Sequence, residues 1–102
     1  MSSRIAKGAR IEKIAADQLT AEGYLLTRAI RTKWQRQDMF NCWDIIAIKT
    51  PQIRFIQVSA SPIYDRGIAY KKKLADFPQF CKHASKEYWW YQKGGGWQIT
   101  VL

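Results

Sequence analysis

The sequence predicts an α/β fold in which one mixed β-sheet is flanked by helices. Three observations lead to this class. An apolar repeat with helical spacing occupies the first 22 residues, short runs rich in β-branched and aromatic residues follow, and a basic helical stretch precedes the last two such runs. Helices and sheets each have an apolar side to bury, and one sheet covered by helices accounts for the order α-β-β-β-α-β-β.

The first helix is expected over residues 3–22. Its apolar side chains recur three and four positions apart, which places them on one helical face: Ile11, Ile14, Ala15 and Leu19. Gly23 is a natural stop, because glycine adopts the conformation that ends many helices. Residues 24–30 then predict a short strand, and the polar, basic and aperiodic residues 32–41 predict a loop.

Two neighbouring strands are expected at residues 42–49 and 53–60, where β-branched and aromatic residues dominate. The intervening Thr50, Pro51 and Gln52 form a plausible hairpin turn, so we expect the two strands to pair in antiparallel fashion.

The second half of the chain predicts a basic helix at residues 68–77, which Pro78 interrupts, and a second short helix at residues 79–85. Residues 87–92 and 97–102 predict two final strands. A glycine-rich turn joins them, because glycine supplies the positive φ that a tight turn needs: Lys93, Gly94, Gly95 and Gly96.

The length and net charge of the chain limit the functions that it can have. The 102 residues fit a single domain, residues 1–102, that buries a modest core. The chain has 17 Lys and Arg against 8 Asp and Glu, a net charge of +9, which favours a polyanionic partner and nucleic acid first. No segment approaches the roughly 20 apolar residues of a membrane-spanning helix, and none has the pattern of a signal peptide. We therefore expect a soluble, intracellular, cytoplasmic protein with no membrane partner.

Cys42 and Cys81 are expected to be reduced and packed in apolar surroundings, since cysteine is among the most buried residue types. Two thiols and one histidine cannot build a zinc site with the usual spacing, which argues against zinc fingers and histidine-metal nucleases. His83 has no nearby acidic or cysteine companion in the sequence, and we assign it no role.

Four polar residues stand out against this apolar pattern. Side chains alternate along a strand, so Gln57 and Ser59 are expected on one face. Asp44, near the start of the preceding strand, comes close to Ser59 if the hairpin closes. On the first helix, Glu12 shares a side with Leu19, which puts its carboxylate beside the buried stripe, where it needs a partner.

These residues belong to a longer pattern, made of residues 7–12 (KGARIE), Gly23, Tyr24, Arg28, residues 43–48 (WDIIAI) and residues 56–59 (IQVS). The pattern resembles that of the PD-(D/E)XK nucleases, especially the archaeal Holliday-junction resolvases, over roughly residues 5–92. The resemblance implies a restriction-endonuclease-like αβββαβ core, here with an extra C-terminal strand, and a Mg²⁺ or Mn²⁺ site. It assigns Glu12, Asp44 and Gln57 to the metal and puts Ser59 at the family's lysine position, so all four are candidate catalytic residues.

Glu12 and Asp44 match the family, whereas Gln57 and Ser59 depart from it. An amide oxygen can still ligate a hard cation, although without charge. Serine is the more serious departure, because its hydroxyl supplies only a neutral hydrogen bond, roughly half as strong as a charge-assisted one. We expect weak or absent activity through this position. The candidates to supply a cation from elsewhere are Lys71, Lys72 and Lys73.

Several basic and aromatic residues are candidates for contacts with nucleic acid. Four lie between the first helix and the Asp44 strand, where a phosphate backbone would pass: Arg28, Arg31, Lys33 and Arg36. Lys71, Lys72 and Lys73 are candidates for the same role, or form an exposed helix face. The aromatic residues of the last two predicted strands have three alternative roles: core packing, a dimer interface or stacking on bases. They are Tyr88, Trp89, Trp90, Tyr91 and Trp97. Asp38 is either a further ligand or a solvated loop carboxylate.

The leading hypothesis is a magnesium-dependent endodeoxyribonuclease, a hydrolase that acts on branched or structured DNA. The substrate class follows from the resemblance and not from the composition. A homodimer is expected on the same ground, because a resolvase cuts two strands symmetrically. Two alternatives stay open: a catalytically inactive nucleic-acid-binding module of the same fold, and an aromatic-rich protein-interaction domain whose charge serves only solubility.

Overall fold

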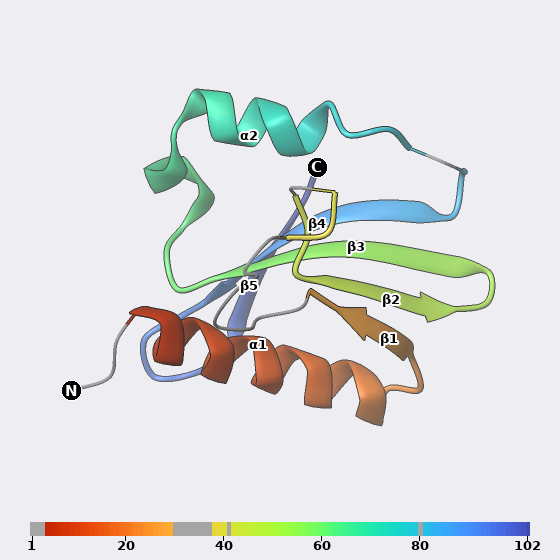
Figure 1. The fold of residues 1–102 in the computed structure, drawn as a ribbon, viewed down its shortest axis with the longest axis horizontal. Helices are drawn as coiled ribbons and strands as arrows, with labels where there is room; N and C mark the ends of the chain where they lie inside the picture. Colours follow the sequence, from red (N-terminus) through yellow and green to blue (C-terminus); the bar gives the residue numbers. More distant parts are fainter. Residues whose placement is uncertain (1–3, 30–37, 41, 80) are drawn as a thin grey trace.

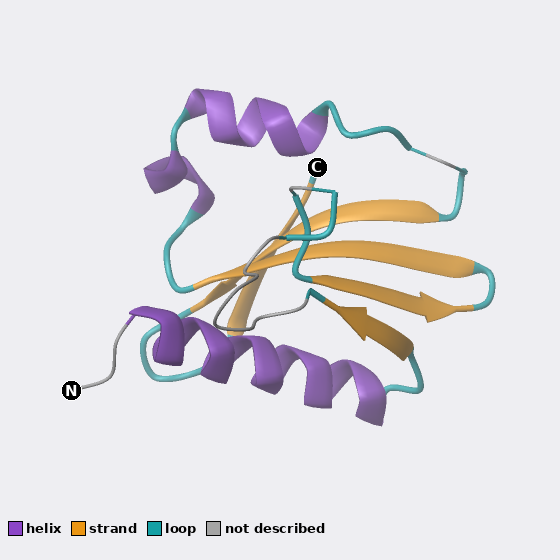
Figure 2. Cartoon of the chain, in the orientation of Figure 1, coloured by secondary structure: helices purple, strands orange, loops and turns teal. Residues whose placement is uncertain are grey.

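In a computed structural model of the chain, the described residues are 4–29, 38–40, 42–79 and 81–102. A five-stranded sheet in the order β1-β2-β3-β4-β5 separates two helices, which lie on its opposite faces (Figure 1). Figure 2 shows this arrangement as one layer of strands between the helices. The described part of the chain contains no helix that is both long and apolar enough to traverse a bilayer.

The first helix, α1 (Arg4–Ala21), turns its apolar side toward the sheet. Ile11, Ala15 and Leu19 are each at most 2% exposed, which confirms the helical repeat expected there. Gly23 follows with φ of 95°, a left-handed conformation that glycine adopts without strain and that ends the helix.

The next three strands form an antiparallel meander: β1 (Leu25–Arg28), β2 (Ile45–Lys49) and β3 (Gln52–Ser59). Arg28 lies opposite Ile45, which in turn lies opposite Ile56. The hairpin between β2 and β3 turns at Thr50 and Pro51, as the sequence predicts.

A crossover then returns the chain to the sheet. It contains the short 3-10 helix η1 (Ile63–Arg66) and the helix α2 (Ile68–Ala75), and it leads to β4 (Ala84–Tyr91), which pairs in parallel with β3. The last strand, β5 (Trp97–Val101), pairs with β4 in antiparallel fashion after a turn whose three glycines have positive φ. The sheet is therefore mixed, and the element order agrees with the order predicted from the sequence.

Strand alternation divides the interior into two cores, one on each face. On β3, Ile56 and Val58 belong to the core that α1 covers, whereas Phe55 belongs to the core that α2 covers. Gln57 and Ser59 alternate with Ile56 and Val58 along β3, so their side chains lie on the α2 side of the sheet. The two polar residues singled out in the sequence are thus on one face, as expected.

The aromatic residues of β4 are mostly interior. Tyr88 and Trp89 are each 1% exposed, which supports the core-packing alternative for these two residues. Tyr88 belongs to the core under α2 and Trp89 to the core under α1, where Trp97 on β5 packs with ring centroids 5.3 Å from Trp89 and 4.8 Å from Tyr91.

Three details differ from the sequence predictions. The predicted short helix at residues 79–85 is wrong, because residues 81–83 form a turn and β4 begins at Ala84, which pairs with Ile53 of β3. Cys81 lies in that turn and is exposed, so only Cys42 is a buried thiol; both cysteines are free. Residues 42–44 precede β2 instead of forming its start, and Trp43 pairs with Met39 in an isolated bridge.

Candidate functional site

Glu12 is buried on α1, where it is 5% exposed. Arg28 on β1 donates a hydrogen bond from Nε to Glu12 Oε1 at 3.2 Å and so provides the partner that a buried carboxylate needs. Because Arg28 lies opposite Ile45, this ion pair is at the same end of the β1–β2 pair as Asp44. The Arg28 guanidinium thus neutralises Glu12, and the contact of Arg28 with a phosphate stays a prediction.

Asp44 immediately precedes β2 and is 4% exposed. Its backbone N–H donates to the Ile56 carbonyl oxygen at 2.9 Å, which extends the pairing between β2 and β3. Its side-chain Oδ2 accepts a hydrogen bond from the Val58 N–H, also at 2.9 Å. The carboxylate therefore joins the start of β2 to the last residues of β3, next to Gln57 and Ser59.

Gln57 is 6% exposed, and its Oε1 is buried without a hydrogen-bond partner among the residues that the structure describes. An unsatisfied buried polar atom costs about 1–3 kcal/mol. On one side Gln57 lies opposite Tyr88 of β4, and on the other it lies one step beyond the Ile45–Ile56 pair, beside Asp44. The amide oxygen is thus an acceptor suited to a ligand that brings a proton or a positive charge.

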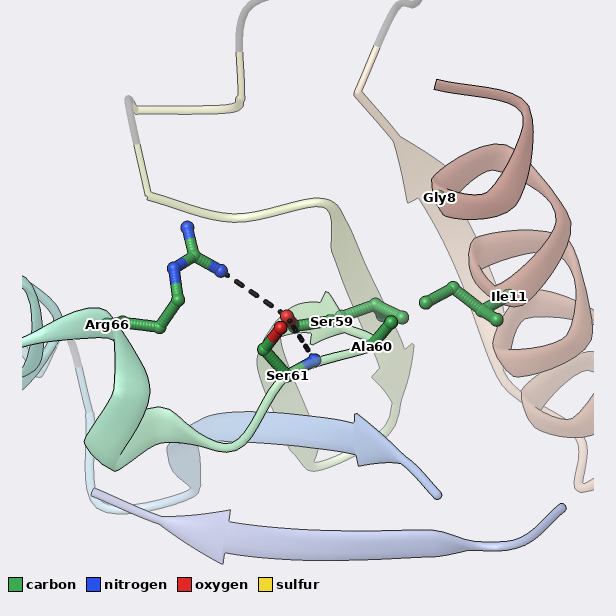
Figure 3. A pocket seen from close by; sticks show the side chains of 7 residues that line it. Gly8, Ile11, Ser59, Ala60, Ser61 and Arg66 are labelled. Carbon is green, nitrogen blue, oxygen red and sulfur yellow. Dashed lines mark hydrogen bonds between the residues drawn. The ribbon is translucent and has the colours of Figure 1, made fainter. Parts of the chain in front are cut away.

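Ser59 ends β3 and has a cation beside it. Its Oγ accepts hydrogen bonds from the Ser61 N–H at 3.0 Å and from Arg66 Nη1 at 3.3 Å (Figure 3). The guanidinium of Arg66 also lies over the ring of Tyr70, 4.2 Å from its centroid, in a cation–π contact. These contacts place the permanently charged guanidinium of Arg66 beside Ser59. The resemblance to the PD-(D/E)XK pattern offers only the neutral serine hydroxyl at this position.

This cation comes from η1 and not from the lysine run that the sequence offers as a candidate. Lys71, Lys72 and Lys73 are all exposed on α2, and Lys72 forms an ion pair with Asp76 one turn along the helix. The three lysines therefore form an exposed helix face, which is the second interpretation of the sequence. Their contact with a phosphate backbone stays a prediction. Arg66 reaches Ser59 because η1 turns the chain back beside the end of β3.

Tyr70 adds a second buried polar atom to this region, since its hydroxyl oxygen is buried and unpaired within the described part of the chain. Burial raises the pKa of Tyr70, and Arg66 opposes the rise. The carboxylates of Asp44 and Asp38 raise this pKa further, so both lie within electrostatic range of the phenol. Polar and charged groups thus gather between the end of β3 and the start of α2.

An open cleft of about 590 Å³ gives access to this region from α1 and η1. In Figure 3, Arg66 and α1 approach the Ser59–Ser61 segment from opposite sides. Ser59 and Arg66 both line the cleft, whereas Gln57 and Asp44 are buried and do not line it. Its lining residues are Gly8, Ile11, Val58, Ser59, Ala60, Ser61 and Arg66.

A further buried carboxylate, Glu87 on β4, has a different role. Arg54 donates to it from Nε at 2.8 Å and from Nη2 at 2.6 Å, and Ser85 Oγ and Trp89 Nε1 donate at 2.5 and 2.9 Å. Burial acts to raise the pKa of Glu87, but these hydrogen bonds outweigh it and the pKa is lowered. Because both oxygens are fully engaged, Glu87 is a structural link between β3 and β4. Sequence analysis had assigned it only to the start of a strand.

The donors available to a metal ion are few. In the described part of the chain, no three His, Cys, Asp or Glu side chains lie close enough to share an ion. Asp44 is next to Gln57 across the β2–β3 pair, and Gln57 Oε1 has no hydrogen-bond partner among the described residues. Mg²⁺ is commonly held by one or two protein oxygens together with water and substrate phosphate, so these two residues stay candidate ligands. Glu12, the third predicted ligand, is paired with Arg28.

Some sequence predictions cannot be placed and one is refined. Arg31, Lys33 and Arg36 lie outside the described residues. Asp38 is half-buried, and its charge acts on both Tyr70 and Cys42, so it is nearer the candidate site than a solvated loop carboxylate would be.

Sequence reasoning missed Arg66 and Tyr70. The available signal was Pro62, which caps η1 and directs the chain back toward the sheet after β3 ends. Comparison of the chain with family models, with curated proteins and with solved structures found no match.

Proposed function

We propose that the chain is a metal-dependent endonuclease-like protein that acts on DNA, branched or structured as in a Holliday junction. The main support is the buried polar group at the end of β3, where Gln57 Oε1 has no partner among the described residues and lies beside Asp44. Such groups are rare in proteins because they are destabilising, and they often mark ligand or catalytic sites. The order of helices and strands is also compatible with a restriction-endonuclease-like core plus one C-terminal strand.

Within this proposal, Asp44 and Gln57 hold Mg²⁺ or Mn²⁺. When bound, the ion would engage the scissile phosphate, lower the pKa of an attacking water and stabilise the leaving oxygen. Ser59 positions Arg66, whose charge stabilises the negative charge that develops on the phosphate. Because Arg66 is exposed, solvent and salt screen its charge, and we expect slow turnover.

The proposal includes a homodimer, since two-fold pairing provides two sites for two strands. Tyr64 on η1 and Ile68 on α2 are 76% and 88% exposed, and large exposed apolar side chains are suited to such a contact. Light scattering should then give a mass near twice that of the chain.

A second candidate is a catalytically inactive nucleic-acid-binding module. One observation favours it: both carboxylates of the site already have structural roles, Asp44 with the Val58 N–H and Glu12 with Arg28. On this alternative the polar side chains stabilise the end of the sheet, and only the basic surface acts on the partner.

Cleavage of a four-way junction and of a matched duplex, in Mg²⁺ and in Mn²⁺, separates the two candidates. The D44N variant keeps an oxygen that can accept the Val58 hydrogen bond but removes the charge. The D17N variant, which removes an exposed carboxylate on α1, is the matched control. We expect wild type and D17N to cleave the junction and D44N to lose at least about 100-fold in rate.

If none of the three proteins cleaves and all bind DNA in a salt-dependent manner, the inactive module is correct. If the chain neither cleaves nor binds DNA, both candidates fail and a protein-interaction domain remains.

A further inference from the structure

A second cleft, of about 460 Å³, lies beyond the end of β3. Ala60, the residue that follows β3, lines both clefts, so the two clefts are neighbours at this residue. The second cleft runs between α1 and the β4–β5 turn, and its polar lining includes Arg10 and Lys93.

Three cations line the two clefts. Arg66 in the first cleft, and Arg10 and Lys93 in the second, have no carboxylate partner within the described residues. By contrast, Lys13 on α1 and Lys72 on α2 are each paired with an aspartate one helical turn away. The clefts therefore hold positive charge that no carboxylate among the described residues neutralises.

Gly8 points to an occupant of the first cleft. It lies within α1, where glycine lowers helix stability relative to alanine. Packing does not require glycine there, because an added Cβ would meet no atom within 4 Å, and its φ is not in the left-handed region. Gly8 does line the cleft, so a larger side chain would fill space that is now open.

We propose that the two clefts form one binding path for the phosphodiester backbone of a nucleic acid strand. Arg66, Arg10 and Lys93 contact phosphates along it, and Gly8 keeps it open. The path passes Ser59, which lines the first cleft and lies two residues after Gln57 on β3. A polyanion is the occupant that matches three unneutralised cations in a chain of net charge +9. The choice of nucleic acid rests on the proposed function, but binding along this path does not require cleavage.

The charge part of the proposal is tested by DNA binding in EDTA, where metal-dependent cleavage cannot occur. A labelled single strand and a labelled duplex are titrated with wild type, R10A, R66A and K93A at several salt concentrations. K13A on α1 and K82A in the turn before β4, both at exposed lysines that line neither cleft, are the controls. We expect each cleft variant to weaken binding several-fold and to reduce the slope of log K against log[salt] by about 0.7–0.9, while the controls bind as wild type does.

Equal losses in cleft and control variants, or no loss in either, would overturn the path. The same would follow if the cleft variants weakened binding to phosphatidylserine vesicles but not to DNA, because the occupant would then be a lipid surface. These binding measurements need no turnover, so they can be interpreted even if the protein is catalytically inactive. Conversely, cleavage activity would not by itself establish binding along the two clefts.

Gly8 provides an independent test that separates binding from folding. We expect G8A to raise the thermal midpoint by a few degrees, because alanine is the better helix former. G8L should fold at least as stably as wild type but bind DNA several-fold more weakly, whereas A9L, at the neighbouring exposed position, should bind normally. Normal DNA binding by a folded G8L variant would exclude the first cleft from the path.

Discussion

Under the proposed function, Ser59 and Arg66 together take the place of the single lysine of the PD-(D/E)XK pattern. The serine hydroxyl holds the guanidinium by one hydrogen bond of 3.3 Å, and the Tyr70 ring holds it from another side. An exposed charge of this kind acts more weakly than a buried one, since water and salt screen it. A lysine at residue 59 would put the charge at the end of β3 itself.

The S59K variant should therefore cleave faster than wild type in Mg²⁺, by about 10- to 100-fold, given that one donor at a developing anion is commonly worth 10²–10³ in rate. Single-turnover cleavage of a junction measures this difference. S61K adds the same charge to an exposed residue that lines the same cleft and is the control. Equal rates for S59K and S61K would show that position 59 has no special role.

Gln57 allows a prediction about metal binding that does not depend on activity. The Q57E variant places a carboxylate where the described residues offer no donor, and we expect it to lower the free energy of unfolding by about 1–3 kcal/mol without metal. Mn²⁺ should then stabilise Q57E more than wild type, by up to about 2.7 kcal/mol at 100 times its dissociation constant. Thermal unfolding with and without Mn²⁺ measures both effects. Q57L, which has no side-chain oxygen, should not respond; an equal response from Q57L would contradict the metal assignment.

Sequence periodicity predicted the placement of three buried polar residues, but not the burial of Lys86 and Glu87. Helical spacing placed Glu12 beside the apolar stripe, and strand alternation placed Gln57 and Ser59 on one face, as observed. Sequence periodicity did not predict the contact between Arg66 and Ser59. A charged residue in a turn has no periodic signal, and its contact with Ser59 exists only because the chain reverses direction after β3.

At the scale of elements, the parallel pairing of β3 and β4 joins the N-terminal meander to the C-terminal hairpin. Arg54 and Glu87 connect these two strands by two hydrogen bonds, and the Arg54 guanidinium also lies 5.3 Å from the ring centroids of both Tyr24 and Trp89. The pair is well buried, with side-chain exposures of 16% and 4%. Removal of one partner would leave the other charge buried and uncompensated.

R54M should consequently lower the free energy of unfolding by about 3–5 kcal/mol near neutral pH. The pKa of Glu87 is lowered in the folded state, so the pair's contribution is complete above the unfolded pKa of about 4.3 and is lost as the pH falls through the folded value. Urea unfolding of wild type and R54M from pH 7 downward should show the difference narrowing in acid. A difference that stays constant with pH would mean that ionised Glu87 does not cause it.

Local sequence signals predicted the order of the elements but not every boundary. The short helix expected at residues 79–85 gave way to an earlier start of β4, because Ala84 gains a place opposite Ile53 in the sheet. Tertiary pairing of this kind overrides weak local propensity. The parallel register itself depends on the geometry of the crossover, which no single segment encodes.

At the scale of the whole molecule, the sheet separates two cores, and the candidate site lies at one end of it, between α1 and η1. Composition predicts a polyanionic partner, which stays a prediction, but charge counts do not say where such a partner would bind. Among the described residues, Arg66, Arg10 and Lys93 line the two clefts beside Ala60 and have no carboxylate partner.

The affinity of the whole protein for DNA should therefore fall steeply with salt. If three to four phosphates are neutralised, a fourfold rise in salt concentration should weaken binding by about 40- to 150-fold. Fluorescence anisotropy across a salt series measures this fall. An affinity that is insensitive to salt would instead indicate that the net charge of +9 serves solubility alone.

The unequal exposure of the two thiols makes the unmodified chain suitable for site-selective conjugation. Cys81 is exposed in the turn before β4, whereas Cys42 is buried, and burial raises the pKa of the Cys42 thiol, which keeps it protonated and slow to react. A maleimide spin label or fluorophore should thus attach once per protomer. Pairs of such labels would report the separation of two protomers, and their quenching by a tagged oligonucleotide would report its direction across the surface.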